Sequence, residues 1–217
     1  MASIVEGYVG EQLSFDALDK VTWENLRLKF GNYFEIPTCA ELLCPQHKDR
    51  RYWILDAQGE PCGTMGLSLR LPWARHLIAH GLYVSPQARR CGRASTVLFA
   101  AAEAARRHGL PGLSIQTSWL WQDSLRFAMA AGFWYDRWKH EIQLVLIPDG
   151  RAWSFSLDDS SAVFEVRERG RCTLKFVARR DDTRLVLTEP GTPDSDELSS
   201  YFRALGTFSL MLALHGW

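Results

Sequence analysis

A short basic turn between an apolar strand and an alanine-rich segment carries the residues whose types and spacing could do chemistry. Residues 81–94 read Gly-Leu-Tyr-Val-Ser-Pro-Gln-Ala-Arg-Arg-Cys-Gly-Arg-Ala, and a helix is predicted from about Arg93 to His108. A glycine turn that leads from a strand into a helix can bind phosphate, because the first helical N–H groups lack an intrahelical acceptor and the helix dipole is positive there. Arg89 and Arg90 add positive charge to the turn. The alternative is an ordinary connection with solvated arginines.

The spacing of this turn resembles the acyl-CoA-binding motif of the GNAT acyltransferase superfamily, whose loop reads Gln/Arg-x-x-Gly-x-Gly/Ala. The matching residues are Leu82-Tyr-Val-x-Pro86 on the preceding strand, followed by Arg89-x-x-Gly92-x-Ala94. The resemblance covers about residues 51–146, including a Gly132-Phe133 pair after the second helix. It implies acetyl-CoA or another acyl-CoA as co-substrate. The residues that it implies for binding are Leu82, Tyr83, Val84, Arg89, Arg90, Cys91, Gly92, Arg93, Ala94 and Ser95.

The resemblance implies direct acyl transfer to an amine, which must first lose a proton because the pKa of an alkylammonium is about 10.4. Many family members use a glutamate on the strand before the loop, but residues 75–80 contain no carboxylate. His80, and after it His76, is the expected replacement, because histidine titrates near neutral pH. Strand alternation would place His76, Ile78, His80 and Leu82 on one face. The alternative is that His76 lies in a turn and His80 is a hydrogen-bonded edge residue.

The departing thiolate needs a proton, and the family often supplies it from a tyrosine at the position that Ala128 occupies here. Tyr135 or Ser124 could substitute as the catalytic acid. Cys91 could be a nucleophile activated by the helix terminus, but the resemblance requires no thiol there, so a loop filler is the preferred interpretation. Tryptophans around the second helix could line an acceptor pocket or belong to the core.

The elements that must position these residues alternate between strands and helices. Strands separated by helices imply a partly parallel sheet with helices on its faces. The expected fold class is therefore α/β (α+β), with a mixed, partly parallel GNAT-like sheet flanked by helices. The segments predicted are helical structure over 14–31, a hairpin over 52–71, a strand over 77–84, a strand over 113–117, a short helix over about 122–131, and a long strand or bent strand pair over 133–147.

The last part of the chain lies outside the family pattern. Four strands are predicted at 152–157, 162–167, 172–178 and 184–188, followed by a helix from about Asp196. The Pro148-Asp-Gly150 turn marks a boundary between a GNAT-like domain at 1–148 and a small C-terminal extension at 149–217, with an antiparallel sheet and a helix. The extension could recognise the acceptor or form a homodimer.

Composition sets further bounds. The chain has 217 residues, of which 47% are hydrophobic and 23% charged, enough for one sizeable core. Its 25 basic and 25 acidic residues cancel, which predicts no general attraction to nucleic acid or to a membrane. The five cysteines form no CxxC pair, and Cys39, Cys44 and His47 lack a fourth ligand, so reduced thiols and no metal are expected. With no signal peptide or apolar span visible, a cytoplasmic protein is expected.

Three classes of function are consistent with these patterns. The first is an N-acetyltransferase that moves an acetyl group from acetyl-CoA to a primary amine on a small molecule or protein. The second is a GNAT-fold binding protein that has lost catalysis, which the missing glutamate and tyrosine keep open. The third and weakest is a nucleic-acid-modifying acyltransferase. Its basic residues are interleaved with acidic ones, as on a solvated surface: Arg167, Arg169, Arg171, Lys175, Arg179 and Arg180.

Overall fold

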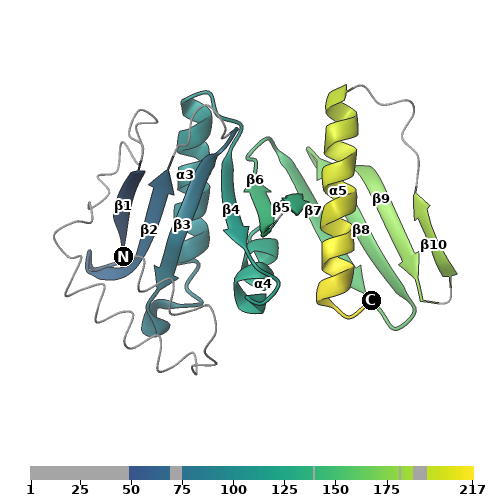
Figure 1. The fold of residues 1–217 in the computed structure, drawn as a ribbon, viewed down its shortest axis with the longest axis horizontal. Helices are drawn as coiled ribbons and strands as arrows, with labels where there is room; N and C mark the ends of the chain where they lie inside the picture. Colours follow the sequence, from purple (N-terminus) through teal and green to yellow (C-terminus); the bar gives the residue numbers. More distant parts are fainter. Residues whose placement is uncertain (1–48, 69–74, 139, 181, 188–194) are drawn as a thin grey trace.

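The protein folds into two β-sheets that lie side by side, with α3 and α4 on the first sheet and α5 at their junction (Figure 1). The helical structure predicted over 14–31 lies outside the described residues, and so do Cys39, Cys44 and His47. The computed structural model describes residues 49–68, 75–138, 140–180, 182–187 and 195–217.

The first sheet has six strands in the spatial order β1-β2-β3-β4-β6-β5. β3 and β4 run parallel, and the other neighbouring pairs are antiparallel. The predicted mixed, partly parallel sheet is therefore confirmed, and the segment 133–147 forms a strand pair. The strands are β1 (Asp49–Leu55), β2 (Pro61–Ser68), β3 (Leu77–Val84), β4 (Leu113–Thr117), β5 (Trp134–Trp138) and β6 (Ile142–Leu146).

Two helices cover one face of this sheet. The crossover from β3 to β4 passes through the short 3-10 turn η1 (Pro86–Ala88) and then α3 (Arg93–Arg107), and α4 (Gln122–Ala130) follows β4. Both helices share one core cluster with the sheet. α3 contributes small buried side chains, which let its backbone lie close to the strands. These side chains are Ala101, Ala102, Ala104 and Ala105.

A β-bulge interrupts β3 immediately before the basic turn. Between its pairings at His80 and Tyr83, β3 has one residue more than β2, and Gly81 there adopts a φ of 57°. An extra residue in one strand reverses the alternation of side chains beyond it. Leu82 therefore packs against the core that α3 covers. The predicted common face for His80 and Leu82 is wrong, because the prediction assumed an unbroken alternation.

The second sheet is antiparallel, with the strand order β10-β9-β8-β7. Together with the last helix it confirms the predicted small antiparallel sheet and helix. A turn at Pro148–Gly150 leads into it, and the Arg106 guanidinium donates a hydrogen bond to the Pro148 carbonyl. The elements are β7 (Arg151–Leu157), β8 (Ser161–Glu168), β9 (Arg171–Arg179), β10 (Asp182–Leu187) and α5 (Ser195–Leu214).

α5 packs against both sheets. The backbone N–H of Tyr135 on β5 donates to Thr207 Oγ1 at 2.9 Å, while Leu210 and Leu214 join the core of the first sheet. A second hydrophobic cluster combines side chains of the two sheets and α5, among them Trp134, Val145, Phe164, Phe176 and Phe208. Residues after 148 thus share a core with residues before it. Among the described residues, no helix is both long and apolar enough to cross a membrane.

Candidate functional site

The basic turn enters α3 through two residues with left-handed backbone conformation. Arg90 has a φ of 62° and Gly92, at the N-cap of α3, has a φ of 74°. Glycine adopts this conformation without the steric cost that a Cβ imposes. A Cβ on Gly92 would have no atom of the described structure within 4 Å, so the space beside this residue is open. The backbone at the turn is therefore accessible to a ligand.

The N-terminus of α3 presents backbone donors to this open space. The Thr96 N–H makes a helical hydrogen bond with the Gly92 carbonyl at 2.9 Å. The N–H groups of Arg93, Ala94 and Ser95 precede it and have no carbonyl acceptor within the helix. No side chain caps this terminus and no acidic residue lies in its first turn. The dipole and the N–H groups together favour an anion such as phosphate.

The arginines of the turn are held in different ways. Arg89 Nε donates to the Val84 carbonyl at 2.9 Å, and its guanidinium lies 5.6 Å from the centre of the Tyr83 ring. Arg93 Nη1 donates to the Leu55 carbonyl at 3.2 Å, across the end of β1. Arg90 is exposed. Two of the three guanidinium groups therefore anchor the turn to the strands, so the backbone N–H groups are the donors best placed for an anion.

Beside the turn, β3 and β4 separate. Their parallel pairing extends from Leu77 with Leu113 to Ala79 with Ile115 and then stops, although β4 continues to pair with β6 as far as Thr117. Among the described strands, none pairs with the β4-facing edge of β3 beyond Ala79. Such an edge offers a row of N–H and C=O groups to an extended ligand. Thr117 Oγ1 is buried there and has no hydrogen-bond partner among the described residues.

His80 lies on the face of the sheet opposite α3, one residue before the bulge. It pairs with Gly66 on β2, and its half-buried imidazole lies over the Gly66 Cα. A Cβ on residue 66 would come within 2.6 Å of Nδ1 and 2.8 Å of Nε2. Only glycine at residue 66 leaves room for the ring in this position. Gly66 was not among the predicted site residues, although a glycine inside a strand is a known signal for such a close approach.

The other predicted catalytic residues lie elsewhere. Ser124 is exposed on α4. The ring of Tyr135 packs on Gly206 of α5. β5 is three strands from β3, or about 14 Å, and the register places Tyr135 on the opposite face of the sheet from His80. The structure therefore does not bring His80 and Tyr135 together.

His76 precedes β3 and is 8% exposed. Burial lowers its pKa, which the neighbouring carboxylate of Asp136 partly opposes. Arg203, whose guanidinium is 3.8 Å from Asp136, also lies close enough to disfavour the protonated form of His76. His76 is thus a buried side chain whose charge is influenced by Asp136 and Arg203, and it lies four residues before His80 in the chain.

The opened strand edge and the uncapped N-terminus of α3 lie at the same end of β3, an arrangement in an α/β fold that suits a ligand with a phosphate group and an extended arm. The model of the acetyltransferase (GNAT) family matches residues 18–133. This span is more than half of the chain. The chain therefore belongs to the GNAT acetyltransferase family, which uses acyl-CoA as co-substrate.

Solved structures with a similar arrangement are distant in sequence. The PaiA N-acetyltransferase of Thermoplasma acidophilum, in complex with coenzyme A, is 12% identical, with 67% of this chain and 84% of that chain covered and a TM-score of 0.42. A GNAT-family acetyltransferase of Staphylococcus aureus is 12% identical, with 67% and 87% covered and a TM-score of 0.40. No curated protein matches the chain.

The described residues fit an acyl-CoA. The accessible N–H groups after Gly92 suit a pyrophosphate, and the edge of β3 from which β4 diverges suits the amide-bearing arm of the ligand. Thr117 provides a buried hydroxyl that lacks a hydrogen-bond partner among the described residues. No group of three or more potential metal ligands occurs in the part of the chain that the structure describes.

Proposed function

We propose that the protein transfers an acetyl group from acetyl-CoA to a primary amine. The observation that carries this proposal is the position of the α3 N-terminus at the end of the opened β3 edge. Residues 82–84 on that edge and 89–95 at the turn would hold the co-substrate, with backbone N–H groups on the phosphates. The amine acceptor is a small molecule or a protein side chain, and the enzyme works in the cytoplasm.

In this proposal His80 accepts the proton that the acceptor ammonium must lose. The amine nitrogen then bonds to the thioester carbonyl carbon, and the carbon–sulfur bond breaks without a covalent enzyme intermediate. Two observations support His80 as the general base. It lies beside the bulge, where β3 diverges from β4, and its ring packs over Gly66. Proton transfer by a positioned side chain contributes about 10²–10⁴-fold to rate. That Tyr135 or Ser124 donates a proton to the departing thiolate remains a prediction.

A second candidate is a binding protein of the same fold without catalysis. It is favoured by one observation: the position where relatives often carry the tyrosine acid is Ala128, which is 0% exposed and packed in the core. An acid is helpful but not obligatory for a CoA thiolate, so this absence lowers the expected rate and leaves CoA binding intact.

The experiment that separates the two candidates follows free thiol during incubation of the full chain with acetyl-CoA and a panel of primary amines. Amine-dependent thiol release that His80→Ala abolishes supports the transferase. CoA binding by calorimetry together with no release for any amine supports the binding protein. Mass spectrometry of the acceptor confirms that an acetyl group was transferred to nitrogen.

A nucleic-acid acceptor is the weakest candidate. The basic residues of β8 and β9 are partly neutralised, because Glu165 pairs with Arg167 at 2.8 Å and with Lys175 at 3.1 Å. Paired, exposed charges of this kind are typical of a solvated surface. The extension would instead recognise the amine acceptor or form a homodimer, and sedimentation of the full chain tests the dimer.

A further inference from the structure

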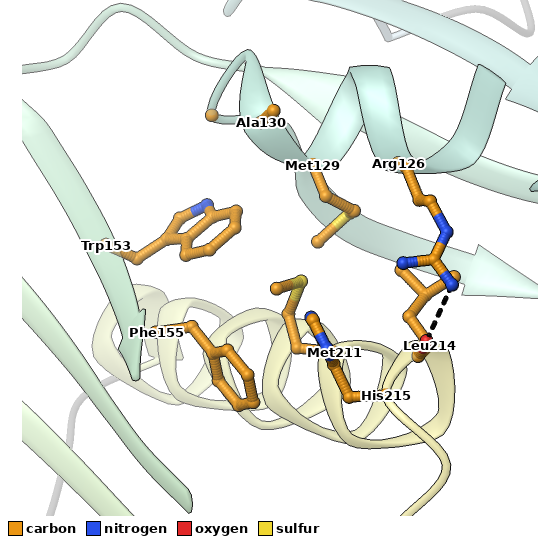
Figure 2. Close-up of a pocket in the computed structure, with 9 residues that line it drawn as sticks. Arg126, Met129, Ala130, Trp153, Phe155, Met211, Leu214 and His215 are labelled. Atoms are coloured by element: carbon orange, nitrogen blue, oxygen red, sulfur yellow. Dashed lines mark hydrogen bonds between the residues drawn. The ribbon is translucent and has the colours of Figure 1, made fainter. Parts of the chain in front are cut away.

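A cavity of about 350 Å³ lies between α4, β7 and α5, where the family fold meets the extension. None of its lining residues belongs to the basic turn or to β3. Ligand pockets have volumes of about 300–1,000 Å³, so this one has room for a small molecule. The residues that line it include Arg126, Met129, Trp153, Phe155, Met211 and Leu214 (Figure 2).

The aromatic wall of this pocket is held in place before any ligand arrives. Trp153 Nε1 donates to the Phe133 carbonyl at 3.1 Å, and its ring stacks on Phe164 with 5.4 Å between ring centres. Phe155 stacks on His215 at 5.3 Å. A wall fixed by such contacts loses little conformational entropy when a ligand binds. The pocket therefore presents a preformed flat apolar surface.

The opposite wall is adaptable. Met129 of α4 and Met211 of α5 extend toward one another across the pocket (Figure 2). Methionine is unbranched and polarizable, and its sulfur makes favourable contacts with aromatic rings. An aromatic group between Trp153 and the two methionines would contact a rigid surface on one side and flexible side chains on the other.

One charged side chain at the edge of this pocket, the exposed Arg126, has no ion-pair partner among the described residues. Arg126 Nη2 donates to the Leu214 carbonyl at 3.0 Å, which leaves Nε and Nη1 without acceptors in the described structure. No carboxylate of the described residues forms an ion pair with Arg126. A guanidinium with spare donors binds a carboxylate through charge-assisted hydrogen bonds.

We propose that this pocket binds a small aromatic monocarboxylate, with its ring between Trp153 and the two methionines and its carboxylate on Arg126. A neutral ligand would gain no charge-assisted hydrogen bond from Arg126, and a cationic ligand would be repelled. This site is separate from the proposed acetyl transfer, so its test needs no enzyme activity. It would give the protein a second ligand at the junction of the two sheets.

The test uses NMR of the full chain labelled at the methionine methyl groups. The sequence has four methionines. Met129 and Met211 line the pocket, whereas Met65 is buried in the core of the first sheet and serves as an internal reference. Met129→Leu and Met211→Leu assign the signals. The probes are 3-phenylpropionate, the neutral 3-phenylpropionamide and the cationic 3-phenylpropylamine.

We expect 3-phenylpropionate to shift the Met129 and Met211 signals at lower concentrations than the amide, and the amine to have little effect. Arg126→Met should weaken carboxylate binding by about tenfold or more and leave amide binding unchanged. Arg107→Met, at an exposed arginine of α3 outside the pocket, is the matched control and should change nothing. Ala130→Phe, at the pocket edge, should block all three probes.

The proposal is overturned if millimolar 3-phenylpropionate leaves both signals unchanged. It is equally overturned if the three probes bind alike, since the pocket would then capture apolar groups without recognising an anion. A shift of Met65 without Met129 and Met211 would place the ligand elsewhere and would also refute the site.

Discussion

The imidazole of His80 and the Cα of Gly66 face one another across β3 and β2. β2 is held between β1 and β3, so its backbone at Gly66 cannot easily move away. A methyl group on residue 66 would come within 2.6 Å of Nδ1 of His80. The glycine therefore determines where the nitrogens of His80 lie, and through them the proposed proton transfer.

Gly66→Ala should displace the His80 ring and lower the rate of thiol release by up to about 10²-fold, because a misplaced base loses most of its catalytic contribution. CoA affinity, measured by calorimetry, should stay within about twofold. In a His80→Ala background, Gly66→Ala should cause no further loss of rate. An additional loss in the double variant would show that residue 66 acts through another group.

Gly92→Glu should weaken CoA binding by at least about tenfold, because it places a negative charge at the proposed pyrophosphate site. Gly92→Ala is the matched control, since either side chain at this φ costs about 1–2 kcal/mol of strain and only glutamate adds charge. Calorimetry with CoA measures both variants. Equal affinities for wild type and Gly92→Glu would refute the anion-binding role of the turn.

Gly206→Ala should destabilise the protein, although alanine in a helix is normally favoured over glycine by about 0.5–1 kcal/mol. The added Cβ would come within 2.8 Å of Tyr135 Cε1 and 3.1 Å of Cγ. Overpacking of this kind costs about 1–3 kcal/mol, so the clash outweighs the propensity. Urea denaturation measures the change. Ser209→Ala, at an exposed position of the same helix, should not be destabilising; a gain in stability for Gly206→Ala would mean that Tyr135 does not pack on α5.

His76 should make stability fall as pH decreases below about 6.5. Burial lowers the pKa of His76 in the folded protein, so the unfolded chain binds a proton that the folded chain resists. The free energy of unfolding starts to fall at the pKa that His76 has in the unfolded chain. It falls by at most about 1.4 kcal/mol per pH unit and stops falling at the pKa that His76 has in the folded protein. Denaturation midpoints measured through this range should show a shallower slope for His76→Gln. An identical slope in the variant would assign the effect to other groups.

The strand, turn and helix around Gly92 could be predicted because their causes are local. A glycine before a helix start and an apolar run before a proline act over a few residues. The order of elements through β6 and the antiparallel extension followed from the same kind of signal. The single error about faces, at Leu82, came from a bulge at Gly81, which depends on how β3 pairs with β2 rather than on either strand alone.

The sequence by itself therefore determined the family, the glycine turn that leads into α3 and the type of fold. Only the tertiary structure decided that His80 lies on Gly66, that β3 and β4 part after Ala79, and that Tyr135 packs on α5 instead of near His80. These relations join residues that are far apart in the chain. Their geometry depends on strand register and on the packing of α5, which no local pattern of side chains specifies.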